Sequence, residues 1–145
     1  MNPADIQLVR NGFAAVSADR KAFAAALFGR LFARDPGLRA LFATDLDAHG
    51  ARVFGALAQV VKSLDRLDAI TENLRTLARR HVAYGVEREH YDLLSDALLG
   101  ALAERLGTAF DASARAAWRN AYSVLANTMI EAAGYRLREC TDSAA

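Results

Sequence analysis

The chain has 145 residues, of which 53% are hydrophobic and 24% are charged, and its formal net charge is +1. This length fits one domain, and the amount of apolar material argues against a disordered chain. A charge so close to zero gives no long-range attraction to nucleic acid, so we do not expect nucleic acid as a partner. The single cysteine, Cys140, excludes an internal disulfide scaffold and a cysteine-based zinc site.

The sequence shows neither a membrane helix nor a secretory signal. No uncharged apolar run approaches the ~20 residues that a membrane helix needs. The N-terminal residues lack a basic flank followed by a hydrophobic block. We therefore expect a cytoplasmic protein with no membrane partner.

Apolar side chains recur at helical spacing through the first half of the chain. Asn2 and Pro3 predict an N-cap and a first helical residue, and Asp35 before Pro36 predicts the end of a second helix. We expect Asp35 to cap a short helix over residues 36–42, and a capping sequence at 44–47 to open a helix to about Leu64. The apolar positions of these segments include Ile6, Val9, Phe13, Val16, Phe23, Leu27, Phe28, Leu31, Phe32, Leu46, Val53, Leu57, Val60, Val61 and Leu64.

Three more helices are predicted in the second half. Thr71 is expected to cap a helix that Gly85 ends, a long helix runs from about Arg88 to a stop at Gly107, and Asp111 caps the last one. No alternating strand pattern, internal repeat or interdomain linker competes with this interpretation. The sequence therefore predicts one all-α domain over residues 1–138, with about seven to eight helices and a polar tail over 139–145.

Two of the three histidines lie on apolar helix faces. His81 follows Leu77 by one turn, and His49 precedes Val53 by one turn. A buried imidazole costs about 1–3 kcal/mol unless it is hydrogen-bonded or bound to something. One such histidine is more often a hydrogen-bonded core residue than a ligand. Two on facing helices of a small domain strengthen the case for a ligand role, and neutral imidazole is a common ligand of haem iron.

Three segments carry a resemblance to a known family. FGRLFARDPGLRALF, HGARVF and LARRHVAYGV, in this order and at this spacing, resemble the globins, and the likeness extends from about Ile6 to Glu131. It is greatest to bacterial single-domain globins and to neuroglobin. The resemblance implies a three-over-three helical sandwich and a haem b cofactor.

The resemblance also assigns roles to residues. His81 is similar to the proximal histidine, whose Nε2 binds iron while Nδ1–H donates to a carbonyl near Leu77. His49 is similar to the distal histidine, Phe42 to the phenylalanine that stacks on the porphyrin, and Val53 to the aliphatic residue on the ligand side. The remaining implied contacts are Phe28 on the distal side, an apolar wall that includes Leu77, Val86, Leu94 and Leu98, the proximal-side Tyr91, and Gly50 crossing closely opposite Ala24.

Charged and polar positions around this site are also implied. Arg52 and Arg80 are candidates for pairing with the haem propionates. His90 is interpreted as a helix-start residue and not as a ligand. Phe28 and His49 stand where flavohaemoglobins usually have tyrosine and glutamine, and the glutamate of their proximal relay is replaced by Ala133. This makes efficient nitric oxide dioxygenation doubtful.

The sequence leaves several functions open. His49 either donates a hydrogen bond to a bound ligand or coordinates iron itself, which would give a six-coordinate, bis-histidyl state. The leading hypothesis is reversible binding of O2, and of CO and NO, for transport, storage or sensing, by a monomer or weak homodimer that is not itself expected to be an enzyme. One alternative is NO dioxygenase or nitrite reductase activity supported by a separate reductase. Another is a helical sensor or interaction module without haem.

Overall fold

The computed structural model describes residues 1–42, 46–83 and 85–134, without the side chains of residues 41, 42, 46 and 47. These residues form α-helices and short 3-10 helices, and they contain no strand. The α-helices are α1 (Pro3–Ser17), α2 (Arg20–Arg34), α3 (Leu46–Lys62), α4 (Thr71–Ala83), α5 (Arg88–Leu106) and α6 (Ala112–Ala133). The 3-10 helices are η1 (Pro36–Phe42), η2 (Leu67–Ile70) and η3 (Gly107–Ala109). The all-α prediction is confirmed.

Most helix ends follow the capping signals in the sequence. The Asn2 side chain accepts a hydrogen bond from the Asp5 backbone N–H at 2.8 Å, and Asp111 accepts one from Ala114 at 2.9 Å. These side chains satisfy N–H groups that have no partner in the first turn of a helix. At the end of α5, Gly107 has a φ of +58°, a conformation that glycine adopts without the strain of a Cβ.

Three expectations about local structure need correction, and a fourth falls on residues that the structure does not describe. The described residues contain six α-helices, fewer than the seven to eight expected, because residues 36–42 form the 3-10 helix η1. The helix expected to reach Leu64 ends at Lys62. Thr71 is the first residue of α4 and not its N-cap, because η2 runs directly into α4 and the Thr71 hydroxyl donates to the Leu67 carbonyl at 3.1 Å. The expected cap at residues 44–47 and the tail at 139–145 lie outside what the structure describes.

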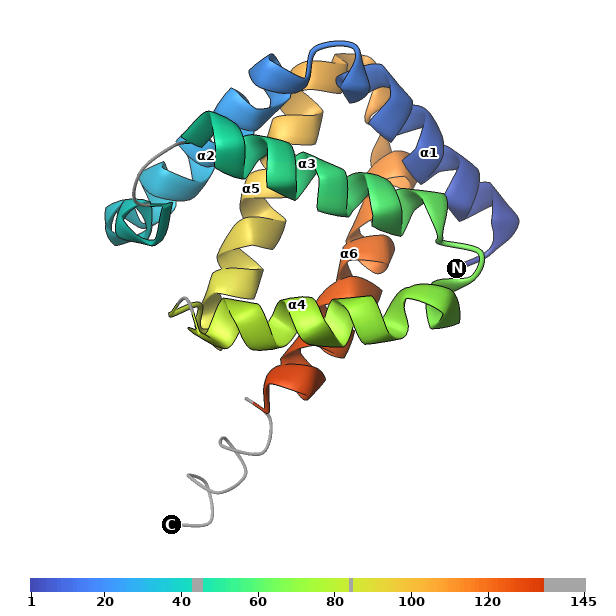
Figure 1. Ribbon diagram of the computed structural model, residues 1–145. Helices are drawn as coiled ribbons and strands as arrows, with labels where there is room; N and C mark the ends of the chain where they lie inside the picture. The colour runs from blue at the N-terminus through green and yellow to red at the C-terminus, as the bar shows by residue number, and fades with distance from the viewer. Residues whose placement is uncertain (43–45, 84, 135–145) are drawn as a thin grey trace.

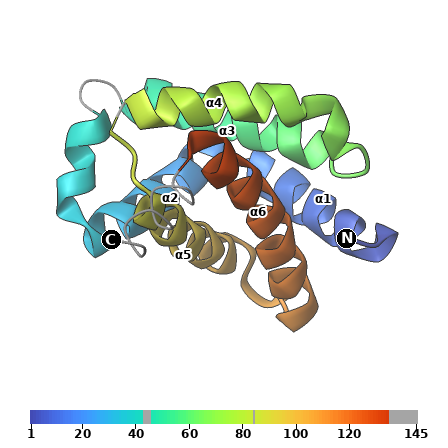
Figure 2. The ribbon, with the colours of Figure 1, turned by 90° about the horizontal axis from the view of Figure 1, so that it is seen from below.

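The helices pack in two layers (Figures 1 and 2). Helices α3 and α4 lie on one side, and α5 and α6 lie on the other. Helix α3 packs against α1 and α2, whereas α4 packs against α6. Helices α3 and α4 run antiparallel, so the first turn of α3 and the last turn of α4 lie at the same end of the molecule.

The core is filled by apolar side chains from all of the α-helices. Phe23, Leu102 and Val9 are its largest fully buried members, and Trp118 is 2% exposed. Burial of such side chains is the main force that holds amphipathic helices together. Across the described ranges, no helix has the length and apolar character to cross a membrane.

Candidate functional site

The structure brings the helix turns that carry His49 and His81 to one end of the fold. His49 belongs to the first turn of α3, and His81 to the last turn of α4. Both side chains are half-buried. Because α3 and α4 run antiparallel in the same layer, two residues 32 positions apart in the chain come from helix ends on the same side of the molecule.

The hydrogen bond of His81 determines which ring nitrogen can act as a ligand. Nδ1 of His81 lies 2.8 Å from the Leu77 carbonyl oxygen, as the resemblance implied. A carbonyl oxygen only accepts hydrogen bonds, so Nδ1 carries the proton in this contact. In the neutral ring, Nε2 then has a free lone pair, which is the form that binds a metal ion. The segment after α4 turns back on the same residue, since the Val86 N–H donates to the His81 carbonyl at 2.9 Å.

The α3 side of the site is built on a close helix crossing. Gly50 is buried next to His49, and a Cβ on it would lie 3.3 Å from the Cβ of Ala24 and 3.5 Å from Cε2 of Phe28. The expected contact between Gly50 and Ala24 is therefore present. The Phe28 ring is 6% exposed and stacks on Phe32, with centroids 5.8 Å apart. This places a hydrocarbon ring beside the first turns of α3.

The remaining apolar residues of the predicted wall come from α3, α4, α5 and the segment between α4 and α5. Tyr91 and Leu98 are buried, and the half-buried members are Val53, Leu77, Val86 and Leu94. The sequence did not identify what holds the start of α5, which is the Tyr122 hydroxyl donating to the Tyr91 carbonyl at 2.5 Å. Burial raises the pKa of Tyr122, so this hydroxyl keeps its proton. The sequence signal that could have indicated this contact is a tyrosine, Tyr122, on the apolar face of the last helix.

The polar residues around the site separate into two groups. Arg52 and Arg80 are exposed, and no described contact tests their predicted pairing with propionates. His90 is a helix-start residue, as expected: its Nδ1 accepts the Glu87 backbone N–H at 2.9 Å and completes a capping box.

Phe42 is the last residue of η1, and its side chain lies outside the described part of the structure.

Comparison with known proteins decides the family. The family model described as "Globin" matches residues 25–129, which is most of the chain and includes both helices of the site. The chain belongs to the globin family. It is therefore a haem-binding protein, and the three segments singled out in the sequence carried a correct resemblance.

The relatives of this globin fall into several groups. The neuroglobin of Tetraodon nigroviridis is 30% identical over 139 residues, which cover 86% of this chain and 87% of that protein. An uncharacterized globin-like protein of Aquifex aeolicus is 32% identical over 106 residues, 73% of this chain and 75% of the relative. A flavohemoprotein of Xylella fastidiosa (strain 9a5c) is 28% identical over 131 residues, which cover 88% of this chain but 33% of that longer protein.

The residues at the site fit a haem group. The contact of His81 Nδ1 with the Leu77 carbonyl leaves Nε2 as the ring nitrogen that can act as a ligand. Phe28, Tyr91 and Leu98 supply buried apolar surface of the kind that a porphyrin needs around it. The donor and the apolar side chains are thus of the kinds that a haem group requires.

Proposed function

We propose that this globin holds haem b between α3 and α4, with Nε2 of His81 as the proximal ligand, and that it binds O2 reversibly. The observation that carries this proposal is the 2.8 Å hydrogen bond from Nδ1 of His81 to the Leu77 carbonyl. It orients the ring and makes Nε2 more basic, as the outer hydrogen bonds of metal-binding histidines do.

The bound haem would supply an iron atom that takes O2, CO or NO as a ligand. The protein's own residues would control access to the side of the haem on which that ligand binds. Phe28 and Val53 exclude water there, because they present hydrocarbon beside the first turns of α3. His49 provides the polar group on this side. Arg52 in the second turn of α3 and Arg80 in the last turn of α4 are exposed, and we assign them to the solvent-facing propionates.

We further propose that His49 competes with the external ligand by coordinating the iron from the opposite side. In that case, the apparent affinity for O2 or CO is the intrinsic affinity reduced by the fraction of sites from which His49 is dissociated. His49 lies in the first turn of α3, a helix end that is joined to α2 through the Gly50 crossing. A half-buried imidazole at this position can donate to a bound ligand or coordinate the iron, and we propose coordination because the set Phe28, His49, Arg52 and Val53 resembles that of neuroglobin.

The same site does not favour NO turnover as the main function. The side chain beside Gly50 is Phe28, which has no hydroxyl to donate to a bound ligand. We therefore propose ligand binding, and we assign any redox cycle to a separate reductase.

Absorption spectra of the oxidised, reduced and CO-treated protein test these proposals. His81→Ala is expected to abolish stable haem uptake, and unchanged uptake in this variant would refute the proximal assignment. His49→Leu is expected to convert a six-coordinate ferrous spectrum into a five-coordinate, high-spin one. His90→Asn is the matched control, since His90 caps α5, and its spectra should equal those of the wild type.

A further inference from the structure

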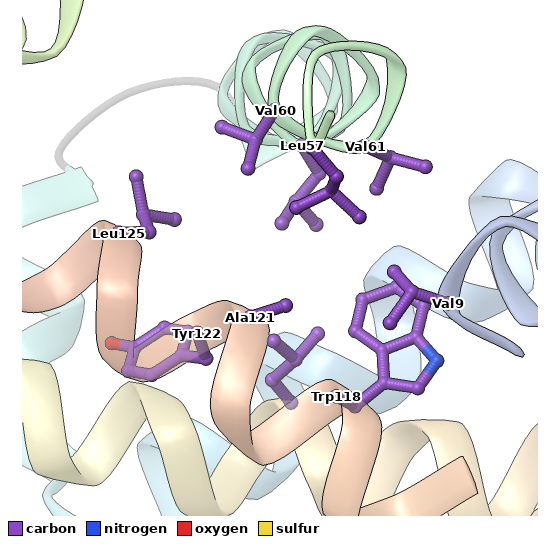
Figure 3. A pocket seen from close by; sticks show the side chains of 10 residues that line it. Val9, Leu57, Val60, Val61, Trp118, Ala121, Tyr122 and Leu125 are labelled. Carbon is purple, nitrogen blue, oxygen red and sulfur yellow. The ribbon is translucent and has the colours of Figure 1, made fainter. Parts of the chain in front are cut away.

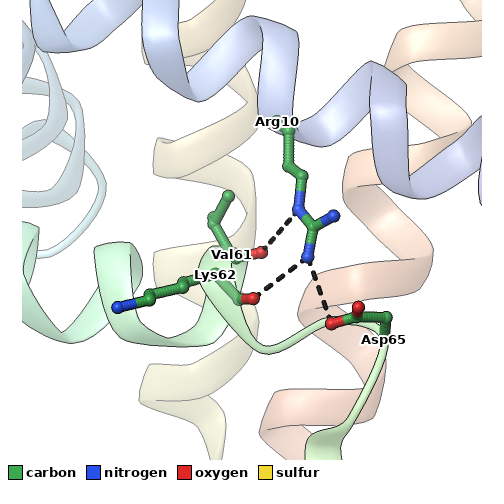
Figure 4. Close-up of polar contacts among 4 residues, drawn as sticks. All are labelled: Arg10, Val61, Lys62 and Asp65. Carbon is green, nitrogen blue, oxygen red and sulfur yellow. Dashed lines mark hydrogen bonds and ion pairs between the residues drawn. The ribbon is translucent and has the colours of Figure 1, made fainter.

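The side chain of Arg10 joins α1 to the far end of α3 (Figure 4). Its Nε donates to the Val61 carbonyl at 3.2 Å, and its Nη2 donates to the Lys62 carbonyl at 3.0 Å and to Asp65 Oδ1 at 3.2 Å. These carbonyls belong to the last two residues of α3. One guanidinium therefore contacts the end of α3 and the segment that follows it.

Arg10 completes the hydrogen bonding of this helix end. The last four carbonyls of a helix have no partner within the helix. In α3, the Ser63 N–H donates to the carbonyls of Gln59 and Val60, and Arg10 donates to those of Val61 and Lys62. The positive charge also meets the negative end of the helix dipole. The N–H groups of the Arg10 guanidinium thus hold the end of α3 against α1.

The same half of α3 has free space on its other side. An apolar cavity of about 20 Å³ lies between α3 and α6, with Val61 and Leu64 on one wall and Ala121 on the other. Figure 3 shows the α3 side chains above this space and those of α6 below it. Side chains that line such a space lack packing partners on one side. The cavity therefore leaves α3 room to shift toward α6.

We propose that Arg10 is a positioning residue: by holding the last turn of α3, it sets how far His49 in the first turn reaches toward His81. His49 and Lys62 lie about 20 Å apart along α3, at 1.5 Å per residue, and a rigid helix that moves at one end also moves at the other. This inference rests on the proposed function, because it concerns the approach of His49 to the haem iron. Loss of the Arg10 contacts lets α3 move, and His49 then dissociates more readily.

The test compares Arg10→Met with Arg34→Met. Arg34 makes an ion pair with Asp96 at 2.9 Å between α2 and α5, so its removal breaks an interhelical contact that does not involve α3. In the haem-loaded ferrous protein, Arg10→Met is expected to raise the five-coordinate fraction about three- to tenfold and to speed CO binding by the same factor. Arg34→Met should change neither. Filling the cavity by Ala121→Val in the Arg10→Met protein should restore part of the six-coordinate fraction.

A second readout follows the helix itself. Spin labels on Ala51→Cys in α3 and Ala83→Cys in α4, with Cys140→Ser, report the distance between the two helix ends, since both alanines are exposed. Measured in the CO form, where His49 does not hold the helix, the distance distribution should broaden or shift in Arg10→Met alone. Should Arg10→Met fail to fold, Arg10→Lys is the second variant, because it keeps the positive charge but lacks the several N–H donors of the planar guanidinium. It should show a smaller change in the spin-label distances, in the same direction.

The outcomes separate the two proposals. A five-coordinate ferrous spectrum in the wild type would refute His49 coordination, and the spin-label distances would then decide the role of Arg10. If Arg10→Met, or Arg10→Lys in its place, lowers the unfolding temperature as Arg34→Met does but leaves coordination and distances unchanged, Arg10 is only structural and the inference is overturned.

Discussion

The close crossing of α2 and α3 at Gly50 supports a prediction that two glycines of one helix can test. A Cβ on Gly50 would lie 3.3 Å from the Cβ of Ala24, whereas a Cβ on Gly55 would meet no atom within 4 Å. Alanine is favoured over glycine inside a helix by about 1 kcal/mol. Gly55→Ala should therefore stabilise the protein by about that amount. At Gly50, the tight contact offsets the same gain, and we expect a change near zero.

Valine enlarges the difference between the two sites. Overpacking of a dense contact costs about 1–3 kcal/mol, so Gly50→Val should be less stable than Gly55→Val by about 2 kcal/mol. The helix propensity is common to both variants, so this difference isolates the crossing. Urea denaturation followed by circular dichroism measures it, and for a chain of this length 1 kcal/mol corresponds to about 3 °C in Tm. Equal stability changes at Gly50 and Gly55 would show that α2 and α3 do not meet closely there.

Three further predictions concern the core, a cap and the start of α5. Leu102→Ala should lower the free energy of unfolding by about 2–5 kcal/mol in urea, because Leu102 is 0% exposed. Asp111→Ala should cost about 1 kcal/mol, since it removes the cap of α6; Asp111→Asn, which keeps an acceptor, is the control. Tyr122→Phe removes the donor to the Tyr91 carbonyl and should cost about 1–3 kcal/mol. The raised pKa of Tyr122 means that the native state favours the protonated form, so stability should fall above about pH 10, and this fall should be smaller in Tyr122→Phe. An unchanged alkaline limit in this variant would contradict that cause.

The sequence was a good guide to the site wherever one turn of helix defined the contact. His81 and Leu77 are four residues apart, so their hydrogen bond needs only that the segment be helical. His90 and Glu87 form their capping box for the same reason. Thr71 was wrongly placed as a cap, because the sequence did not reveal that η2 precedes α4 without a break.

The chain by itself determined its helical class and most of its helix ends, because each depends on groups a few residues apart. The tertiary structure alone decided the rest. Arg10 reaches Val61, 51 residues away, and Tyr122 reaches Tyr91, 31 residues away. Such contacts, and the antiparallel placement of α3 and α4 that brings two histidine-bearing turns to one end, follow from which apolar faces pack together. Apolar burial is not directional, so a local pattern identifies a face that will be buried but not the helix that will cover it.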